Sequence, residues 1–132
     1  MSNDFSEYTI LVAEDDEINR EIMAALLGKT GISVDFAENG KRAVALFQEH
    51  PERYNMILMD VHMPEMDGYT ATRTIRALDS EIAKNIRIIA LTADVFREDI
   101  EKCLSAGMDE HLGKPIFPNE LYAKLEKNLI TK

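Results

Sequence analysis

Acidic side chains directly follow two short apolar segments of the chain. Residues 9–13 lead into Glu14 and Asp15, and residues 56–59 lead into Asp60. Carboxylates that lie about 5 Å apart repel one another by roughly 3 kcal/mol per pair at an effective dielectric constant of about 20, so a cluster of them needs a counter-charge. Because oxygen ligands without cysteine or a convergent set of histidines select a hard cation, the residue types favour Mg²⁺ and disfavour zinc.

A hydroxyl group and an ammonium group complete the set of candidate residues. Thr92 follows a further apolar segment, and Lys114 stands directly before a proline. Beside a carboxylate that holds a cation, these groups suit phosphoryl transfer, in which Asp60 attacks phosphorus, Thr92 donates a hydrogen bond and Lys114 neutralises charge on the phosphoryl oxygens. The product would be an aspartyl phosphate. Taken alone, Asp60 could also simply begin a turn, since Pro64 and Gly68 follow it.

Five apolar segments of strand length alternate with five segments of helical period. The strands are expected at residues 9–13, 32–37, 56–60, 86–91 and 110–113. This alternation predicts the α/β class, with a parallel sheet that is covered by helices on both faces. Because the carboxyl ends of parallel strands share one edge of the sheet, the candidate side chains are expected to meet there although they are far apart in the chain.

The helices are expected to turn apolar stripes toward the sheet. In the first helix, apolar residues recur at i, i+4, i+7 and i+8, at Ile18, Ile22, Ala25 and Leu26. The helix that ends at Gly107 carries a similar set, at Phe96, Ile100, Cys103 and Leu104. The single cysteine therefore belongs to a helical pattern and is expected to be a packed thiol rather than a reactive one.

The composition indicates a single folding unit. The chain has 132 residues, of which 45% are hydrophobic and 30% are charged, and its formal net charge is −9 at pH 7. One domain is expected over residues 9–130, after a flexible leader at residues 1–8. The acidic excess argues against direct binding of nucleic acid through phosphate contacts. No apolar run is long enough to cross a membrane and no secretory signal is visible, so a cytoplasmic location is expected.

Together, the motifs resemble those of response regulator receiver domains of two-component signalling. The resemblance covers about residues 9–130 and rests on four motifs in the family's order, at residues 14–15, 59–68, 91–93 and 113–115. Each motif is short, but four of them at the family's spacing are specific. Residues 14–21, 90–93 and 106–109 are most similar to the receivers of hybrid sensor histidine kinases.

The resemblance implies a flavodoxin-like fold of five βα units with strand order 2-1-3-4-5. It implies that a sensor histidine kinase or a histidine phosphotransfer domain passes a phosphoryl group from a phosphohistidine onto Asp60, with Mg²⁺ as the cofactor. The domain would catalyse its own phosphorylation and dephosphorylation without being an enzyme in the usual sense. Asp15 and Asp60 would bind the cation directly and Glu14 through water. The backbone carbonyl of His62 would be a further ligand, and the Lys114–Pro115 bond would be cis.

The resemblance also implies a switch. A phosphoryl group adds roughly 1.5 to 2 negative charges and would draw Thr92 toward Asp60, which favours a second packing of the fourth helix and fifth strand. The face formed by the fourth helix, fifth strand and fifth helix would then bind a partner differently, and a second copy of the chain is one possible partner. His111 falls where the family usually has an aromatic residue coupled to this switch, or is a plain surface histidine. The His62 side chain either tunes hydrolysis of the phosphate or is merely exposed.

Alternatives follow from the same residues. The acidic pair could be Asp15 and Asp16, although the family's spacing favours Glu14 and Asp15, with Asp16 facing solvent or capping the helix. A magnesium-dependent phosphatase of the haloacid dehalogenase type also forms an aspartyl phosphate, but it needs a second aspartate where this chain has His62. A third hypothesis is a receiver that serves only as a scaffold and is not phosphorylated. Both a free-standing regulator and the receiver of a larger hybrid kinase fit the sequence.

Overall fold

The centre of the molecule is a sheet of five parallel strands in the order β2-β1-β3-β4-β5. The computed structural model of the protein describes residues 4–93 and 96–130. The strands are β1 (Thr9–Ala13), β2 (Ser33–Ala37), β3 (Met56–Asp60), β4 (Arg87–Thr92) and β5 (Glu110–Gly113). The predicted α/β class and the flavodoxin-like order 2-1-3-4-5 are confirmed.

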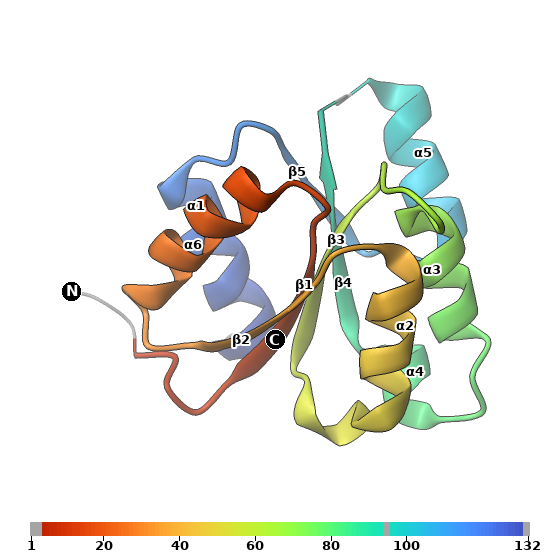
Figure 1. The fold of residues 1–132 in the computed structure, drawn as a ribbon, viewed down its shortest axis with the longest axis horizontal. Helices are drawn as coiled ribbons and strands as arrows, with labels where there is room; N and C mark the ends of the chain where they lie inside the picture. Colours follow the sequence, from red (N-terminus) through yellow and green to blue (C-terminus); the bar gives the residue numbers. More distant parts are fainter. Residues whose placement is uncertain (1–3, 94–95, 131–132) are drawn as a thin grey trace.

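Helices cover both faces of the sheet (Figure 1). One face carries α1 (Glu17–Gly28) and α6 (Pro118–Leu125), and the other carries α2 (Gly40–Glu49), α3 (Gly68–Arg76) and α5 (Arg97–Ala106). Three short elements complete the described fold, the 3₁₀ turn η1 (Pro51–Arg53), the helix α4 (Glu81–Asn85) and the π-helical turn η2 (Glu126–Ile130). Within the described ranges, no helix has the length and apolar character that a membrane span requires.

The short helix α4 was not predicted. Its N-cap is Ser80, whose hydroxyl accepts a hydrogen bond from the Ala83 N–H at 3.3 Å. Its five residues are too few to show a helical period in the sequence. The helix, strand and helix that the family resemblance assigns to the switch are therefore α5, β5 and α6 in this structure.

The strands are apolar along their length because both faces of the sheet are covered. Every residue of β3 is buried. Ile57 and Met59 belong to the core beneath α2, α3 and α5, whereas Met56 and Leu58 belong to the core beneath α1 and α6. Burial of a side chain of this size contributes about 1.5–3 kcal/mol. The central strand is thus held from both sides, and it delivers its last residue, Asp60, to the carboxyl edge of the sheet.

The apolar stripe that was predicted to pack in α1 is wrong at Ile18, Ile22 and Ala25, which are exposed, and is confirmed at Leu26, which is half-buried against the core. Ile18 and Ile22 are 66% and 48% exposed, whereas Met23 and Leu27 are buried against the sheet. Both pairs are spaced by four residues, so periodicity alone does not distinguish them. Packing selects between them, because Met23 and Leu27 join the core beneath α1 and α6. The cap at Asp16, whose carboxylate accepts a hydrogen bond from the Ile18 N–H at 2.8 Å, fixes only where the helix begins.

The expected stripe of α5 is confirmed only in part. Cys103 is buried and Ile100 is half-buried, in agreement with the prediction. Leu104 is exposed, and Phe96, which precedes the first turn, is exposed as well. The helix turns Cys103 and Ala106 toward the core, which leaves Leu104 on the outer side.

Residues 4–8, expected to belong to a flexible leader, are anchored by Phe5. Its side chain is 1% exposed in the core beneath α1 and α6, and its backbone N–H donates to the Thr30 carbonyl at 3.0 Å. Two aromatic side chains in this segment explain the difference, because Phe5 is buried, Tyr8 packs against the same core, and this burial offsets the cost of ordering the neighbouring backbone. The first three residues of the expected leader lie outside the described residues.

Candidate metal and phosphoryl-transfer site

The candidate carboxylates meet at the carboxyl edge of the sheet. Glu14 follows β1, and Asp60 ends the neighbouring strand β3. Glu14 and Asp60 are 1% and 3% exposed, whereas Asp15 is exposed. One oxygen of each of the three side chains lies within 4.8 Å of the others. Asp16, the alternative member of the acidic pair, caps α1 instead.

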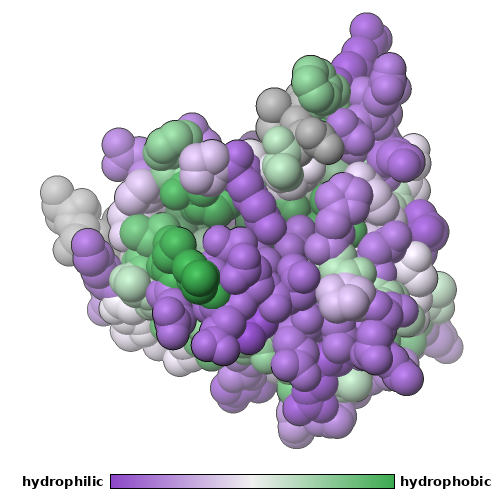
Figure 2. Space-filling model, turned by 45° about the horizontal axis from the view of Figure 1, so that its top comes forward, coloured by the Kyte–Doolittle hydropathy of each residue, from purple (hydrophilic) through white to green (hydrophobic). Residues whose placement is uncertain are grey.

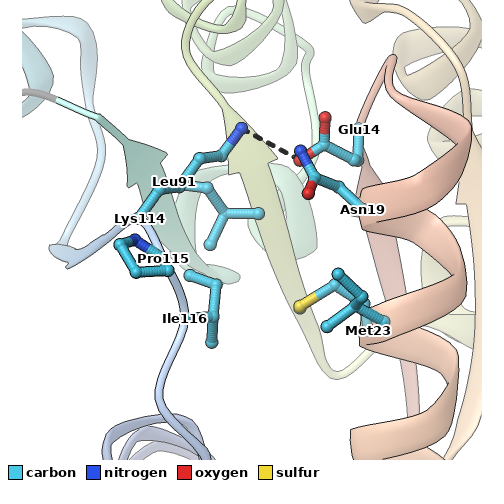
Figure 3. Close-up of a pocket in the computed structure, with 8 residues that line it drawn as sticks. Glu14, Asn19, Met23, Leu91, Lys114, Pro115 and Ile116 are labelled. Carbon is cyan, nitrogen blue, oxygen red and sulfur yellow. Dashed lines mark ion pairs between the residues drawn. The ribbon is translucent and has the colours of Figure 1, made fainter.

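Lys114 reaches this cluster from the turn after β5 (Figure 3). Its ammonium nitrogen lies 3.0 Å from Glu14 Oε1 and 3.0 Å from Asp60 Oδ2. Its backbone N–H donates to the Thr92 carbonyl at 2.8 Å, which fixes the start of the turn beside β4. The Lys114–Pro115 bond is cis, as expected. A single ammonium group therefore bridges two buried carboxylates.

The charges of the cluster shift one another's pKa values. Burial raises the pKa of Asp60 to about 7, while the hydrogen bond from Lys114 opposes this rise and the charge of Glu14 adds to it. At Glu14, burial also acts upward, but hydrogen bonds from Lys114 and from the Asp16 N–H outweigh it and lower the pKa. Burial disfavours the charge of Lys114, but its two carboxylate partners outweigh burial and raise its pKa. Asp60 is therefore the weakly acidic member of the cluster.

This pKa has a consequence for stability in the absence of divalent cations. Because the pKa of Asp60 rises from 3.8 to about 7, the folded protein holds a proton that the unfolded chain releases, and the associated stability is lost as pH rises toward 7. The Asp60→Asn variant does not lose this stability as pH rises, because asparagine does not titrate. We expect its free energy of unfolding to exceed that of the wild type by on the order of 2 kcal/mol at about pH 8, and by little at about pH 4.

Urea unfolding with a chelator at both pH values measures the difference between the two proteins. The expected value is smaller than the full pKa shift implies, because the substitution also deprives Lys114 of one carboxylate partner. A difference that is the same at both pH values would contradict the assignment of the raised pKa to Asp60.

The donor set fits a hard divalent cation. All three side chains offer carboxylate oxygens, which Mg²⁺ prefers, and the exposed Asp15 leaves the cluster open to the water molecules that this ion retains. Across residues 4–93 and 96–130, no second group of three or more His, Cys, Asp or Glu side chains comes close enough to hold a metal ion. The residues present are therefore compatible with the predicted cofactor.

Thr92 and His62 are two further predicted groups, and their backbones lie near Asp60 at the same edge of the sheet. Thr92 is the last residue of β4 and is 1% exposed. The register pairs Asp60 with Leu91, so Thr92 stands one residue further along the adjacent strand. The His62 side chain is exposed, and its backbone N–H donates to Asp60 Oδ1 at 3.2 Å. Both oxygens of Asp60 thus have a donor, and the carbonyl of His62 as a cation ligand stays a prediction.

His111 lies in β5, opposite Ala90 of β4. Residues two apart in a strand point to the same face, so His111 and Thr92 share the face of the sheet that α5 covers. The half-buried His111 lines surface hollows together with Lys124 of α6. This placement is compatible with coupling between His111 and Thr92, which stays a prediction.

A hollow of about 470 Å³ opens beside the cluster, between α1 and the turn after β5 (Figure 3). Its lining is apolar at Met23, Leu91 and Ile116, and Glu14 and Lys114 join it on the side of the cluster. The sequence analysis did not predict this hollow, because it depends on which side of α1 faces the sheet.

Sequence reasoning also missed Arg20. The guanidinium Nη1 of this residue donates to the backbone carbonyl of Glu14 at 2.8 Å. Contact between an arginine and a backbone carbonyl leaves no mark in a hydropathy pattern. The one available signal is the position of Arg20 in the first turn of the helix that follows the acidic pair.

Comparisons with known proteins agree with this geometry. Residues 10–126 match the family model described as the response regulator receiver domain. Probable histidine kinase 4 of Oryza sativa subsp. japonica is 38% identical, over 91% of this chain and 14% of its own length. Hybrid signal transduction histidine kinase I of Dictyostelium discoideum is 39% identical, over 86% of this chain and 7% of its own length. The chain thus spans a small part of the curated relatives that it matches.

Solved structures lead to the same family. The receiver domain of the sensor histidine kinase PA1611 from Pseudomonas aeruginosa PAO1, with a magnesium ion coordinated in its active-site cleft, matches with a TM-score of 0.83 and 40% identity, over 92% of this chain and 96% of that one. The co-crystal structure of the Saccharomyces cerevisiae histidine phosphotransfer protein Ypd1 with the receiver domain of Ssk1 matches with a TM-score of 0.82 and 30% identity, over 93% of this chain and 92% of that one. The chain belongs to the family of response regulator receiver domains.

Proposed function

We propose that this receiver domain takes a phosphoryl group from a phosphohistidine onto Asp60, in a reaction that needs Mg²⁺. One observation carries the proposal. The Lys114 ammonium lies 3.0 Å from Asp60 Oδ2, inside a cluster whose carboxylate oxygens lie within 4.8 Å of one another. A buried nucleophile beside one fixed positive charge, with oxygen ligands for a second, suits a transfer between anionic groups.

In the proposed step, an oxygen of ionised Asp60 attacks phosphorus, and the bond between phosphorus and the donor's imidazole nitrogen breaks. The imidazole leaves with the electron pair of that bond. Before the step, the His62 N–H and the Lys114 ammonium orient the two carboxylate oxygens, at 3.2 and 3.0 Å. Lys114 and the hydroxyl of Thr92 would then bind the oxygens of the transferred group.

Glu14, Asp15, Asp60 and the backbone carbonyl of His62 are the groups that would hold Mg²⁺. When bound, the ion neutralises charge on the phosphoryl oxygens. A second positive charge beside Asp60 also favours its ionised form, which matters because burial raises its pKa to about 7. The magnesium ion in the active-site cleft of the PA1611 receiver supports this assignment.

We propose that the domain also hydrolyses its own aspartyl phosphate. Water reaches the site from the side of Asp15 and His62, whose side chains are exposed. A larger or more apolar side chain at position 62 would restrict that access and lengthen the lifetime of the phosphate. The domain would then limit the lifetime of its own phosphorylated state and would not turn over a separate substrate.

The proposed donors are a sensor histidine kinase and a histidine phosphotransfer domain. The Ssk1 receiver, which is co-crystallised with the phosphotransfer protein Ypd1, supports the second of these. On this chain, the exposed Ile22 of α1 lines the same hollow as Glu14, and the exposed Ile18 lies one turn earlier in the same helix. Figure 2 shows apolar side chains gathered on the side that α1 and α6 cover, beside a largely hydrophilic centre. Such a patch fits an apolar surface of a protein partner.

On the output side, we propose that phosphorylation changes the affinity of the α5-β5-α6 face for its partner. The shared sheet face of Thr92 and His111 supports a connection from the site to this surface. A second copy of the chain is one candidate partner. The cytoplasmic location expected from the composition belongs to the same proposal.

Intact mass after incubation with acetyl phosphate and Mg²⁺ tests the acceptor. The wild type is expected to gain one phosphoryl group, and the gain is expected to disappear in Asp60→Asn and in the presence of a chelator. Asp79→Asn, at an exposed position in the turn after α3, is the matched control and is expected to behave as the wild type.

An adduct that persists in Asp60→Asn would move the acceptor to another residue. An unmodified wild type, with Mg²⁺ bound and with a phosphohistidine donor also supplied, would favour the scaffold reading. Sustained release of phosphate from a small ester would favour the phosphatase reading instead.

A further inference from the structure

The turn that carries the acidic pair is tied to α1 at three points. The Asp16 carboxylate caps the helix by accepting from the Ile18 N–H at 2.8 Å. The Arg20 N–H donates to the Asp16 carbonyl at 3.0 Å. The third tie is a side chain, because Arg20 Nη1 donates to the Glu14 carbonyl at 2.8 Å. That carbonyl belongs to the peptide group that joins Glu14 to Asp15.

The two acidic side chains differ in how they are held. Glu14 is buried, and its carboxylate accepts from the Asp16 N–H at 3.1 Å and lies 3.0 Å from the Lys114 ammonium. Asp15 is exposed, and within the described part of the chain its carboxylate has no hydrogen-bond or ion-pair partner. The direction of its side chain is therefore set by its backbone. Arg20 holds the peptide group that determines this direction.

We propose that Arg20 is a positioning residue for the divalent cation, which it orders by fixing the peptide group between Glu14 and Asp15. The inference rests on the proposed function, since it concerns the same cation. Arg20 does not touch the ion. It acts through the orientation of Asp15, in the way that outer hydrogen bonds orient the direct ligands of other metal sites.

Charge and position predict opposite effects of removing this guanidinium. A positive charge near the site repels a cation, so an arginine that acted through its charge alone would weaken binding, and its removal would strengthen binding. An arginine that positions Asp15 would strengthen binding, and its removal would weaken it. The sign of the change in Mg²⁺ affinity therefore separates the two roles.

The chain offers a matched control in Arg42. Arg20 and Arg42 line the same small hollow of about 150 Å³, together with Phe36 and Glu38. Among the residues that the structure describes, the guanidinium of Arg42 donates no hydrogen bond, and only its backbone N–H is used, in the cap of α2. Arg42→Gln therefore removes the same charge from the same hollow without removing a tie to the acidic turn.

Isothermal titration with Mg²⁺ tests the proposal on the whole chain. Arg20→Gln is expected to weaken Mg²⁺ binding about tenfold, and Arg42→Gln is expected to leave it unchanged or slightly stronger. Arg20→Lys keeps the charge and one donor, so an intermediate affinity is expected. Urea unfolding in metal-free buffer is measured for all variants, so that affinity is compared only between folded proteins.

Unchanged or tighter binding in Arg20→Gln would overturn the proposal, as would equal weakening in Arg42→Gln. If Arg20→Gln does not fold, the Mg²⁺ affinity of Arg20→Lys tests the proposal instead. A wild-type affinity in Arg20→Lys would overturn the proposal, because it would show that a positive charge is sufficient without the geometry of the guanidinium. A wild type that binds no Mg²⁺ at all would overturn the proposed function together with this inference. A wild type that binds Mg²⁺ and takes a phosphoryl group, with Arg20→Gln unaffected, would overturn the inference alone.

Discussion

Replacing Lys114 with methionine is expected to slow the phosphorylation of Asp60 about 100-fold at neutral pH. Two effects act in the same direction. The transferred phosphoryl group loses the ammonium that would face its oxygens, and the carboxylates of Glu14 and Asp60 lose the cation that lies 3.0 Å from each. Because the hydrogen bond from Lys114 lowers the pKa of Asp60, this pKa is expected to rise above about 7, so that less of the nucleophile is ionised.

Initial rates with acetyl phosphate and saturating Mg²⁺, followed by intact mass across neutral pH, measure both effects. The rate of the variant is expected to keep increasing with pH where that of the wild type has levelled off. Lys84→Met is the control, because that ammonium donates to the Leu78 carbonyl at 2.8 Å beside α4 and the same charge is lost there. A Lys114→Met rate within a few-fold of the wild type would falsify the role given to this lysine.

Replacing Gly68 with alanine is expected to lower the free energy of unfolding by about 3 kcal/mol or more. Gly68 begins α3, and a Cβ atom on it would overlap the Asp60 carbonyl oxygen and stand 2.9 Å from the Val61 Cα. Both neighbours are backbone atoms, so no side chain can rotate away. The start of α3 would have to move off the end of β3, and Asp60 would move with it.

Gly28→Ala provides a comparison of opposite sign. Gly28 is the last residue of α1, and a Cβ atom there would meet nothing within 4 Å. Alanine loses less backbone entropy on folding, so this variant is expected to be more stable than the wild type by about 0.5–1 kcal/mol. Equilibrium urea unfolding of both variants is the measurement. If Gly68→Ala lowers the free energy of unfolding by less than about 1 kcal/mol, the start of α3 can move away from β3 at little energetic cost, which would contradict the prediction.

Most of the site can be predicted from the sequence, because the topology of the sheet determines where the site residues lie. Short apolar strands that alternate with helices form a parallel sheet, and parallel strands bring their carboxyl ends to one edge. Glu14 and Asp60 meet there, and Lys114 reaches them from the turn after β5. These positions follow from the alternation and from the chemistry of the residues, without any side-chain detail.

The mispredicted features depend on packing contacts, which the hydrophobic periodicity of the sequence does not determine. In α1, Ile18 and Ile22 have the same spacing as Met23 and Leu27, so the exposed and buried stripes are equivalent in the sequence. Packing against the core beneath α1 and α6 selects Met23 and Leu27, and the spacing of the residues does not record this choice. Phe5 was missed for a similar reason, because one apolar side chain carries no periodic signal.

The tie between Arg20 and Glu14 shows the same limit within the site. It joins a side chain to a backbone carbonyl six residues earlier, so it follows from the geometry of the turn and not from residue type. The hollow beside the cluster likewise depends on how α1 is rotated about its axis. Sequence reasoning thus predicts which groups meet, and the structure adds what holds them in place.

The buried cysteine makes this chain a convenient host for spectroscopic probes. Cys103 is the single cysteine, is 2% exposed, and has its thiol pKa raised by burial. Thiol-directed reagents react with the accessible thiolate form, so they are expected to leave Cys103 unmodified in the folded protein. A cysteine introduced in place of the exposed Leu104 would then be the one site that takes a fluorophore or spin label, and the label would report movement of α5 without any change to the native core.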